Sequence, residues 1–508
     1  MQSILYWLES SAQRMPHKVA VADPDATLTY AELQDQARRI GSWLIANGVR
    51  PRTAVALYAE KSPLVLAAML GVVYAGGFHC VIDVRQPKAR VHGICEALQP
   101  TLVLTDAANA SCANELFGHT SLLVARIEDL PDVIDEPALA AVRTQAMDVD
   151  PLYVNFTSGS TGVPKGVVVS HRSVIDFIPT FVSTFGITDK DVLANQAPFD
   201  FDVSVKDIYA CLLVGATLRI VPRAYFSNPT QLMDYVCDCE ATTLVWAVSA
   251  LCFVSIMGGL DYRVPHGLKR VLFSGEVMPP KQLAIWQDHL PQTSFVNLYG
   301  PTEITCNCTY FCIDRRYDAH ETIPMGKPFA NKQVFLLDDH DQLVPQTVTD
   351  VVGEVCVSGT CLALGYLGDA QRTAQAFVQN PLNRRWMEPI YRTGDLARYD
   401  KDANLVFCAR KDHQIKHLGQ RIELGDIESA AQGVDGVERA VCLYDDRRKR
   451  LVLCYVGSPE RTAVKERLRE LLPSYMVPNN TRKLEQLPLT KNGKVDRDAL
   501  MVIARIKR

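Results

Sequence analysis

The sequence lacks hydrophobic runs of the length that crosses a membrane. No stretch approaches the roughly 20 consecutive apolar residues of a spanning helix, so we expect no membrane insertion. The first fifteen residues, Met1 to Met15, also lack a basic leader and include Glu9, which argues against a secretory signal. This segment favours a short amphipathic helix instead.

An excess of charge of either sign is also missing. The chain has 508 residues, and 53 Lys and Arg stand against 57 Asp and Glu, for a net charge of −4. This balance gives no electrostatic reason to expect a nucleic acid as partner. The hydrophobic fraction of 48% and the charged fraction of 22% are typical of a soluble globular protein.

The cysteines follow neither a disulfide framework nor a zinc motif. Fifteen cysteines in a chain without a leader indicate free thiols in a reducing compartment, so we expect a cytoplasmic protein. Cys306, Cys308 and Cys312 are spaced C-x-C-x3-C, which suits zinc poorly. The alternation over residues 305–309 favours a strand with one buried face.

The length exceeds that of a single domain, so we expect two or more domains. Residues 18–106 and 151–300 alternate strand-like apolar runs with helical stretches, which is the rhythm of an α/β fold. Residues 107–150 are polar and weakly periodic and are predicted to be peripheral connections. Within the first stretch, Thr29 and Glu32 predict a capping box at the start of a helix.

The β character of residues 325–410 and the small strand and helix pattern after them place a boundary near residue 410. We predict an N-terminal core over 1–410, built of α/β subdomains and a β-rich subdomain. A small, mobile α+β domain over 411–508 is predicted to follow.

A glycine-rich decapeptide, residues 157–166, lies between two strand-like apolar runs. Its glycines let the backbone approach a ligand closely, and its hydroxyl and N–H groups suit phosphate oxygens. Lys165 adds a positive charge. The decapeptide is not a P-loop, because Pro164 precedes the lysine and Gly166 follows it. From the residues alone it is either a polyphosphate loop or a Ser/Gly turn with a solvated lysine.

The decapeptide, T-S-G-S-T-G-V-P-K-G, resembles the signature loop of the adenylate-forming superfamily. This superfamily includes acyl-CoA synthetases, luciferases and amino-acid adenylation domains. The resemblance extends over nearly the whole chain and implies ATP as a substrate. It places the following loop residues at the nucleotide: Thr157, Ser158, Gly159, Ser160, Thr161, Gly162 and Lys165.

A second segment, residues 297–303, ends in Y-G-P-T-E. Its Gly-Pro pair predicts a turn, which could be an ordinary surface turn. The resemblance implies that Tyr299 lies against adenine, that Thr302 contacts phosphate and that Glu303 binds Mg²⁺, a cation that prefers oxygen ligands. It also places Asn297 and Gly300 at the nucleotide.

A third segment, residues 391–396, reads Y-R-T-G-D-L. An aspartate after glycine is commonly a turn residue. The resemblance makes Asp395 the ligand of the ribose hydroxyls and Arg410 a second ribose contact. The family usually has glycine at the position of Ala409.

The segment around Lys494 follows an Asn-Gly turn, where a lysine is ordinarily exposed to solvent. The resemblance implies that Lys494 is catalytic and stabilises the charge that develops at the α-phosphate. It also makes Asp412 the hinge about which the C-terminal domain moves between two reaction steps.

Asp202 distinguishes the branches of the superfamily. At the start of a predicted helix it could be an N-cap. It aligns, however, with the aspartate of amino-acid adenylation domains, which implies that its carboxylate pairs with a substrate ammonium. The same alignment implies these further pocket residues: Val203, Lys206, Trp246, Leu272, Ser274, Leu298, Cys306 and Asn307.

Two of these residues bear on the substrate side chain. Trp246 is expected to narrow the pocket. Lys206 stands where many relatives have an apolar residue, and it either pairs with an acidic side chain of the substrate or extends its ammonium to solvent over an apolar stem.

The chain therefore resembles stand-alone amino-acid adenylation enzymes, both peptide-synthetase adenylation domains and D-alanine–carrier protein ligases. This implies a ligase that forms aminoacyl-AMP from ATP and an amino acid with Mg²⁺. The aminoacyl group would then pass to the phosphopantetheine thiol of a separate carrier protein. An acyl- or aryl-CoA ligase and a non-catalytic ATP-binding regulatory protein are the alternatives.

Overall fold

The computed structural model describes residues 2–157, 164–411, 414–417, 419–488 and 495–506. Its fold is α/β, as the sequence predicts. The chain divides into a larger unit (residues 1–84, 99–155 and 167–411) and a smaller unit (residues 85–98, 156–166 and 412–508). Each unit is described by itself.

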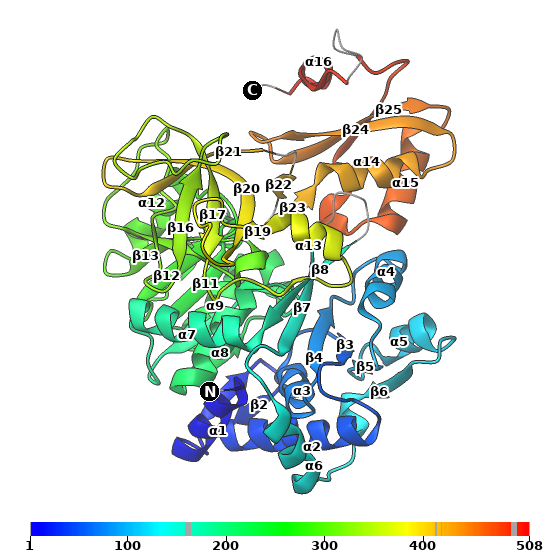
Figure 1. Ribbon diagram of the computed structural model, residues 1–508, viewed down its shortest axis with the longest axis vertical. Coiled ribbons are helices and arrows are strands. Elements are labelled where there is room, and N and C mark those ends of the chain that lie inside the picture. The colour runs from blue at the N-terminus through cyan, green and yellow to red at the C-terminus, as the bar shows by residue number, and fades with distance from the viewer. Residues whose placement is uncertain (1, 158–163, 412–413, 418, 489–494, 507–508) are drawn as a thin grey trace. The chain divides into compact units, whose positions relative to one another are not determined.

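A seven-stranded sheet contains most of the strands predicted before residue 170 (Figure 1). Its order is β18 (Gly365–Tyr366), β8 (Lys165–Ser170), β7 (Pro151–Thr157), β4 (Phe78–Ile82), β3 (Ala54–Tyr58), β5 (Leu102–Thr105) and β6 (Leu123–Arg126). The pairs β3–β4, β3–β5 and β5–β6 are parallel. The buried strands are mostly apolar, with exceptions such as His79 in β4 and Asn155 in β7, as is usual where both faces of a parallel sheet are covered.

Residues 107–150 are more regular than the sequence suggests. They include α5 (Ala110–Phe117), edge strand β6 and α6 (Glu136–Gln145). The polar composition misled the prediction, because a strand at a sheet edge and an exposed helix bury few side chains.

A nine-stranded sheet forms the other layer of the larger unit. Its order is β15 (Lys327–Pro328), β14 (Thr309–Ile313), β13 (Ser294–Tyr299), β12 (Arg270–Ser274), β11 (Thr243–Ala247), β9 (Val192–Asn195), β10 (Thr217–Ile220), β1 (Val19–Ala22) and β2 (Thr27–Thr29). The strands from β13 to β1 in this order are parallel, and antiparallel strands close both edges.

One apolar core joins helices with residues of both large sheets. The helices that contribute to it include α1 (Leu5–Arg14), α2 (Tyr30–Ala46), α3 (Pro63–Tyr74), α7 (His171–Phe185) and α8 (Val203–Val214). The predicted capping box of α2 is present: the Thr29 N–H donates to Glu32 Oε2 (2.8 Å), and the Glu32 N–H donates to Thr29 Oγ1 (3.3 Å).

Further helices belong to the larger unit. They are α9 (Pro229–Asp238), α10 (Val248–Ile256), α11 (Gly259–Tyr262), α12 (Pro280–His289) and α13 (Ala370–Ala376). Across the described part of the chain, no helix combines the length and the apolar character needed to span a bilayer.

The predicted β-rich region is a five-stranded antiparallel sheet. It comprises β16 (Gln333–Leu337), β17 (Gly353–Ser358), β20 (Pro389–Tyr399), β19 (Phe377–Gln379) and β21 (Leu405–Arg410). The pairing of β20 with β21 sets Asp395 opposite Arg410.

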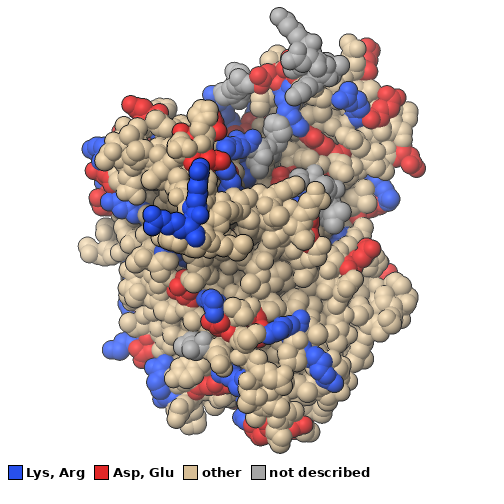
Figure 2. Space-filling model, viewed as in Figure 1, with Lys and Arg blue, Asp and Glu red and all other residues tan. Residues whose placement is uncertain are grey.

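The smaller unit contains α4 (Lys88–Leu98) and the strands and helices of the last hundred residues. The latter are β22 (Gln414–His417), β23 (Gln420–Glu423), α14 (Leu424–Gln432), β24 (Val437–Asp445), β25 (Arg450–Gly457), α15 (Arg461–Leu471), β26 (Asn480–Lys483) and α16 (Arg497–Ile503). Strand β25 pairs antiparallel with β24 and parallel with β26. On the face that Figure 2 shows, Lys and Arg side chains occur among Asp and Glu side chains.

The strand predicted over residues 305–309 is wrong. Strand β14 begins at Thr309, and Thr305 and Cys306 have left-handed φ angles of 57° and 71°, which is rare for a β-branched residue. The backbone of Gly300 lies against this turn: a Cβ at Gly300 would come within 2.6 Å of Asn307 Cα and of the Cys306 carbonyl oxygen. All residues from 305 to 309 are buried. The alternation of residue types that predicted a strand with one buried face therefore belongs to a turn that is buried on all sides.

We expect Gly300→Ala to lower the free energy of unfolding by about 1–3 kcal/mol, the usual cost of forcing an extra methyl group into a packed site. The added methyl group meets backbone atoms, which cannot rotate away. Thermal unfolding followed by calorimetry measures the effect. Gly93→Ala is the matched control, because a Cβ at this helical glycine meets nothing closer than 4.0 Å; an unchanged transition in Gly300→Ala contradicts the steric argument.

Candidate functional site

Asp202 lies immediately before α8 and is 6% exposed. Its backbone is helical, with φ −63° and ψ −16°, and its side chain makes no capping hydrogen bond to the first turn of α8. Its carbonyl oxygen accepts a hydrogen bond from Cys306 Sγ (3.2 Å). The carboxylate is therefore not used as an N-cap, which was the alternative to its role in substrate binding.

Lys206 lies one helical turn after Asp202 and is 1% exposed. Its Nζ donates a hydrogen bond to Asn307 Oδ1 at 2.6 Å. Burial lowers the pKa of the Lys206 ammonium below its usual value. The ammonium does not reach solvent, so the interpretation of Lys206 as a lysine with a solvated tip is wrong.

Asn307 is fixed by contacts at two of its atoms. Lys206 binds its side-chain oxygen, and Lys332 Nζ donates to its carbonyl oxygen at 2.6 Å. Lys332 is 5% exposed, and its Nζ lies 4.0 Å from the centre of the Phe177 ring. A further bond from Thr305 Oγ1 to the Cys361 carbonyl oxygen (2.8 Å) holds the preceding residues.

Most of the predicted pocket residues from the central sheet share one face. Leu272 and Leu298 belong to the same apolar core as Val203 and Cys306. Ser274 is two residues beyond Leu272 on β12 and so lies on the same face of the strand.

Trp246 is an exception. It packs with Ala194 and Phe273 in a second apolar core, and its Nε1 donates to the Ala194 carbonyl oxygen (2.8 Å). Since neighbouring strand residues point to opposite faces, the side chain that shares the face of Leu272 is Val245, which belongs to the first core. The Trp246 side chain thus packs on the face of β11 opposite that of Val245, and its role in narrowing the pocket stays a prediction.

The residues predicted to bind nucleoside form a second cluster. Tyr299 Oη donates to Asp395 Oδ2 at 2.5 Å, and Arg410 forms an ion pair with Asp395 Oδ1. The Asp395 N–H donates to Thr393 Oγ1 (3.0 Å). Burial raises the pKa of the Tyr299 hydroxyl well above its usual value, so the hydroxyl stays a hydrogen-bond donor to the carboxylate.

Thr302 and Glu303 lie in the turn η3 (Thr302–Ile304), which follows Gly300. Glu303 is fully buried, and its Oε1 accepts a hydrogen bond from Tyr366 Oη at 2.9 Å. The Ala363 N–H donates to the Glu303 carbonyl oxygen (2.9 Å). Tyr366 was not predicted as part of the site.

The oxygen ligands of this turn fit a magnesium ion that is bound mainly by phosphates. One carboxylate, from Glu303, and one hydroxyl, from Thr302, are hard donors, and Mg²⁺ usually combines one or two carboxylates with water and substrate phosphates. Among the described residues, no group of three or more His, Cys, Asp or Glu side chains could hold a metal by itself.

The structure describes only some of the other residues that are predicted to bind the nucleotide. Asn297 donates from Nδ2 to the Pro324 carbonyl oxygen (2.8 Å) and lies on the face of β13 opposite Leu298. Thr157 ends β7, and Lys165 begins β8 and is 9% exposed. The remaining predicted residues lie outside the described part of the chain: Ser158, Gly159, Ser160, Thr161, Gly162, Asp412 and Lys494.

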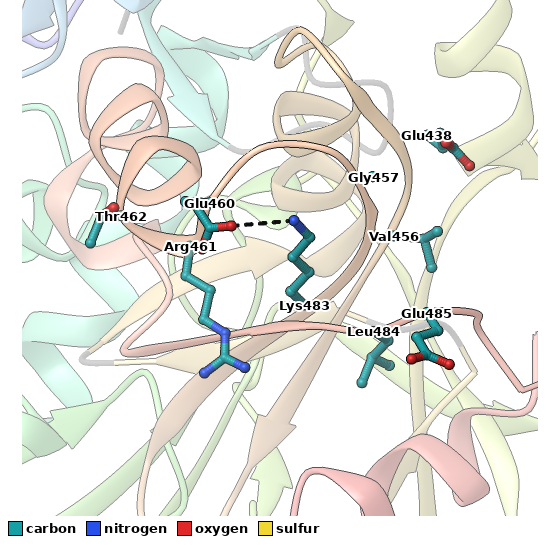
Figure 3. A pocket seen from close by; sticks show the side chains of 9 residues that line it. All are labelled: Glu438, Val456, Gly457, Glu460, Arg461, Thr462, Lys483, Leu484 and Glu485. Carbon is teal, nitrogen blue, oxygen red and sulfur yellow. Dashed lines mark hydrogen bonds and ion pairs between the residues drawn. The ribbon is translucent and has the colours of Figure 1, made fainter.

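A hollow of about 760 Å³ in the smaller unit is separate from these clusters. It lies beside the start of α15, and Figure 3 shows its charged lining, in which Lys483 reaches Glu460 at 3.5 Å. None of its lining residues is a predicted site residue.

Two family models match the chain. The AMP-binding enzyme model matches residues 8–367, and the model of the AMP-binding enzyme C-terminal domain matches residues 426–494.

Curated relatives agree with this family. The chain is 34% identical over 505 residues to tyrocidine synthase 3 of Brevibacillus parabrevis, where the match covers 97% of this chain and 7% of that protein. It is also 34% identical over 505 residues to gramicidin S synthase 2 of Aneurinibacillus migulanus, with 98% and 11% covered. The chain thus spans a small part of the length of these relatives.

Solved structures show the same fold. Holo-PA1221, described as a nonribosomal peptide synthetase protein with adenylation and PCP domains, has a TM-score of 0.85 and 27% identity, over 99% of this chain and 84% of that chain. The adenylation domain AlmE of Vibrio cholerae, solved with glycyl-adenosine-5′-phosphate, has a TM-score of 0.86 over 100% of this chain and 98% of that chain; at 22% identity it supports the fold alone. The chain belongs to the AMP-binding enzyme family, within the adenylate-forming superfamily that includes the adenylation domains of nonribosomal peptide synthetases.

Proposed function

We propose that this protein activates an α-amino acid with ATP and passes it to a phosphopantetheine thiol. In the first step a carboxylate oxygen of the amino acid attacks the α-phosphorus of ATP, which gives aminoacyl-AMP and releases pyrophosphate. The observation that carries the proposal is the buried Asp202 carboxylate, which makes no capping bond to its own helix. A buried carboxylate at a ligand pocket suits an ammonium group.

The roles of the other residues follow from their positions. Asp395, held by Tyr299 and Arg410, accepts hydrogen bonds from the ribose hydroxyls. Glu303 and Thr302 would hold a magnesium ion, which supplies positive charge near the phosphates. The loop that includes Lys165 would supply further positive charge to the phosphates as the new bond forms, and so would Lys494, near the C-terminal end of the sequence.

In the second step the acceptor thiol attacks the carbonyl carbon of the adenylate, AMP leaves, and a thioester forms. The nucleophile belongs to the acceptor, so no side chain of this protein needs to form a covalent intermediate. We propose a separate carrier protein as the acceptor. PA1221 contains a PCP domain next to its adenylation domain, which supports a carrier as the class of partner.

The proposal divides the chain into an adenylation core over 1–410 and a C-terminal domain over 411–508 that moves about Asp412. In this arrangement Lys494 acts in the first step and is withdrawn for the second.

Replacing Asp202 removes the anchor of the ammonium group. We expect Asp202→Asn to lower kcat/KM for the amino acid by about a hundredfold in ATP–pyrophosphate exchange, because an unpaired charge is left buried in the complex. The asparagine keeps the size of the side chain. Binding of a non-hydrolysable ATP analogue, measured by calorimetry, serves as the control and should be unchanged.

The same assay separates the proposed function from its alternatives. It is run with all proteinogenic L-amino acids, several D-amino acids, and fatty and aryl acids that lack an amine. Exchange with amine-free acids alone would show a CoA-ligase type of substrate, and no exchange with any acid would favour a non-catalytic ATP-binding protein.

Replacing Asp395 tests the nucleoside cluster. We expect Asp395→Asn to raise KM for ATP by about tenfold to a hundredfold, the value of charge-assisted hydrogen bonds worth about 1.5–3 kcal/mol. KM for the amino acid should change much less. Asp402→Asn is the control, since Asp402 is exposed in a turn of the same β-rich region; equal effects of the two substitutions would refute the ribose role.

Replacing Lys494 separates the two steps. Loss of one electrostatic group from the transition state costs about a hundredfold to a thousandfold in rate. We therefore expect Lys494→Ala to lose exchange activity by this factor while it still transfers a preformed aminoacyl adenylate to a carrier thiol. Lys491→Ala, three residues earlier, is the control. If both half-reactions fall together in Lys494→Ala, the role in the first step alone is wrong.

A further inference from the structure

The residues predicted to line the substrate pocket include a buried lysine whose hydrogen-bond partner within the protein, Asn307, is neutral. Lys206 is 1% exposed, and its ammonium donates to the side-chain oxygen of Asn307. An ammonium has three N–H donors. Among the described residues, Lys206 forms no ion pair within 4.0 Å, and the Asp202 and Asp207 carboxylates act on it only through longer-range charge interactions.

Asp207 is the carboxylate nearest to Lys206 in sequence, and it accepts its hydrogen bond from another residue. Asp207 follows Lys206 on α8 and is fully buried, and its Oδ2 accepts a hydrogen bond from Asn195 Nδ2 at 2.8 Å. Lys61 Nζ donates to Asn195 Oδ1 and to the Asn195 carbonyl oxygen, both at 3.0 Å. Hydrogen bonds thus link Asp207 of α8 through Asn195 to Lys61.

The pKa values of Asp207 and Lys61 are both shifted by burial in this network. Burial raises the pKa of Asp207 to about 7 and lowers that of Lys61 to about 7. Lys206 and Lys61 both lower the pKa of the Asp207 carboxylate through their charges. Two buried lysines thus share one buried carboxylate, which leaves one positive charge in excess among these three groups.

The neutral partner of Lys206 cannot turn to offer more acceptors. Lys332 holds the Asn307 backbone, and the Thr305–Cys306 turn fixes its direction. Because Oδ1 of Asn307 faces the lysine, its Nδ2 amide, which is a pure donor, faces the other way. Lys206 and Asn307 together offer hydrogen-bond donors to a ligand.

Asp202 and Lys206 are four residues apart, so they lie on one face of α8 and are separated by a rise of about 6 Å. Under the proposed function, the substrate ammonium neutralises Asp202. With a neutral substrate side chain, Lys206 and Lys61 would then share the single Asp207 carboxylate, and one buried positive charge would stay uncompensated, which is energetically costly. An anionic group on the substrate, one turn along the helix from its ammonium, removes that cost.

We infer that the substrate is a dicarboxylic α-amino acid, whose side-chain carboxylate pairs with Lys206 while its ammonium pairs with Asp202. This inference rests on the proposed function and adds the class of the substrate. It makes Lys206 the residue that determines specificity and Asn307 the residue that positions its ammonium.

The test compares acids with their uncharged counterparts in ATP–pyrophosphate exchange by the full chain. The panel is aspartate, glutamate and 2-aminoadipate, in both chiralities, with asparagine, glutamine, alanine and norvaline. We expect one dicarboxylic acid to exceed its amide by at least tenfold in kcat/KM. We expect Lys206→Met, which keeps the volume and removes the charge, to lower the value for the acid about a hundredfold and to reverse its preference over the amide.

Lys332→Met is the matched control. Lys332 is also a buried lysine bound to Asn307, but through the backbone oxygen. Its loss should lower activity toward acid and amide alike and leave their ratio unchanged. Should Lys206→Met fail to fold, Asn307→Asp gives an independent test: the new carboxylate neutralises Lys206 within the protein, and the preference for the acid should disappear.

The outcomes separate a failure of this inference from a failure of the proposed function. Exchange that favours a neutral or cationic amino acid and depends on Asp202 overturns the inference and leaves the proposed function intact. A preference for the acid that survives both Lys206→Met and Asn307→Asp also overturns it. Failure with every amino acid overturns both.

Discussion

The close approach of two backbone segments holds the candidate site together. Gly300 lies so near Cys306 and Asn307 that no side chain fits between them. Before Gly300 comes Tyr299, which contacts Asp395, and after it come Thr302 and Glu303. Residues 299–307 therefore connect the nucleoside cluster to Cys306 and Asn307, which contact Asp202 and Lys206. A short connection of this kind suits a reaction in which two substrates meet in line.

Buried charge is the second constraint. Asp202, Lys206 and Lys332 are each less than a tenth exposed, and removing an ion from water costs several kcal/mol even after relaxation. Hydrogen bonds through Asn307 offset part of this cost for the two lysines. The left-handed turn at Thr305 and Cys306 is needed because it brings both polar ends of Asn307 to these lysines.

The sequence predicted the fold class and most strands, because buried parallel strands are continuous apolar runs and leave a clear pattern. It predicted the tyrosine and aspartate of the nucleoside cluster through short motifs. It did not show that the Trp246 side chain lies on the face of β11 opposite that of Val245, which pairs with Leu272. Strict alternation of faces along β11 is the signal that could have separated the two residues.

Other failures had no local signal. Lys332 lies in a loop and acts through the backbone of a residue 25 positions away, so neither periodicity nor a motif marks it. The interpretation of Lys206 as a lysine with a solvated tip followed from the apolar residue that many relatives have at this position, which does not reveal that the helix is buried on all sides. Ten of the twelve residues of α8 are buried, and only tertiary packing determines that.

Under the proposed function, the burial of α8 would let its charges discriminate between ligands. On an exposed helix, two opposite charges one turn apart stabilise each other by a few tenths of a kcal/mol and are screened by salt. In a site without water, the same charges act on a ligand with little screening. A helix that presents a carboxylate and then an ammonium to such a site favours a ligand with the opposite order of charges.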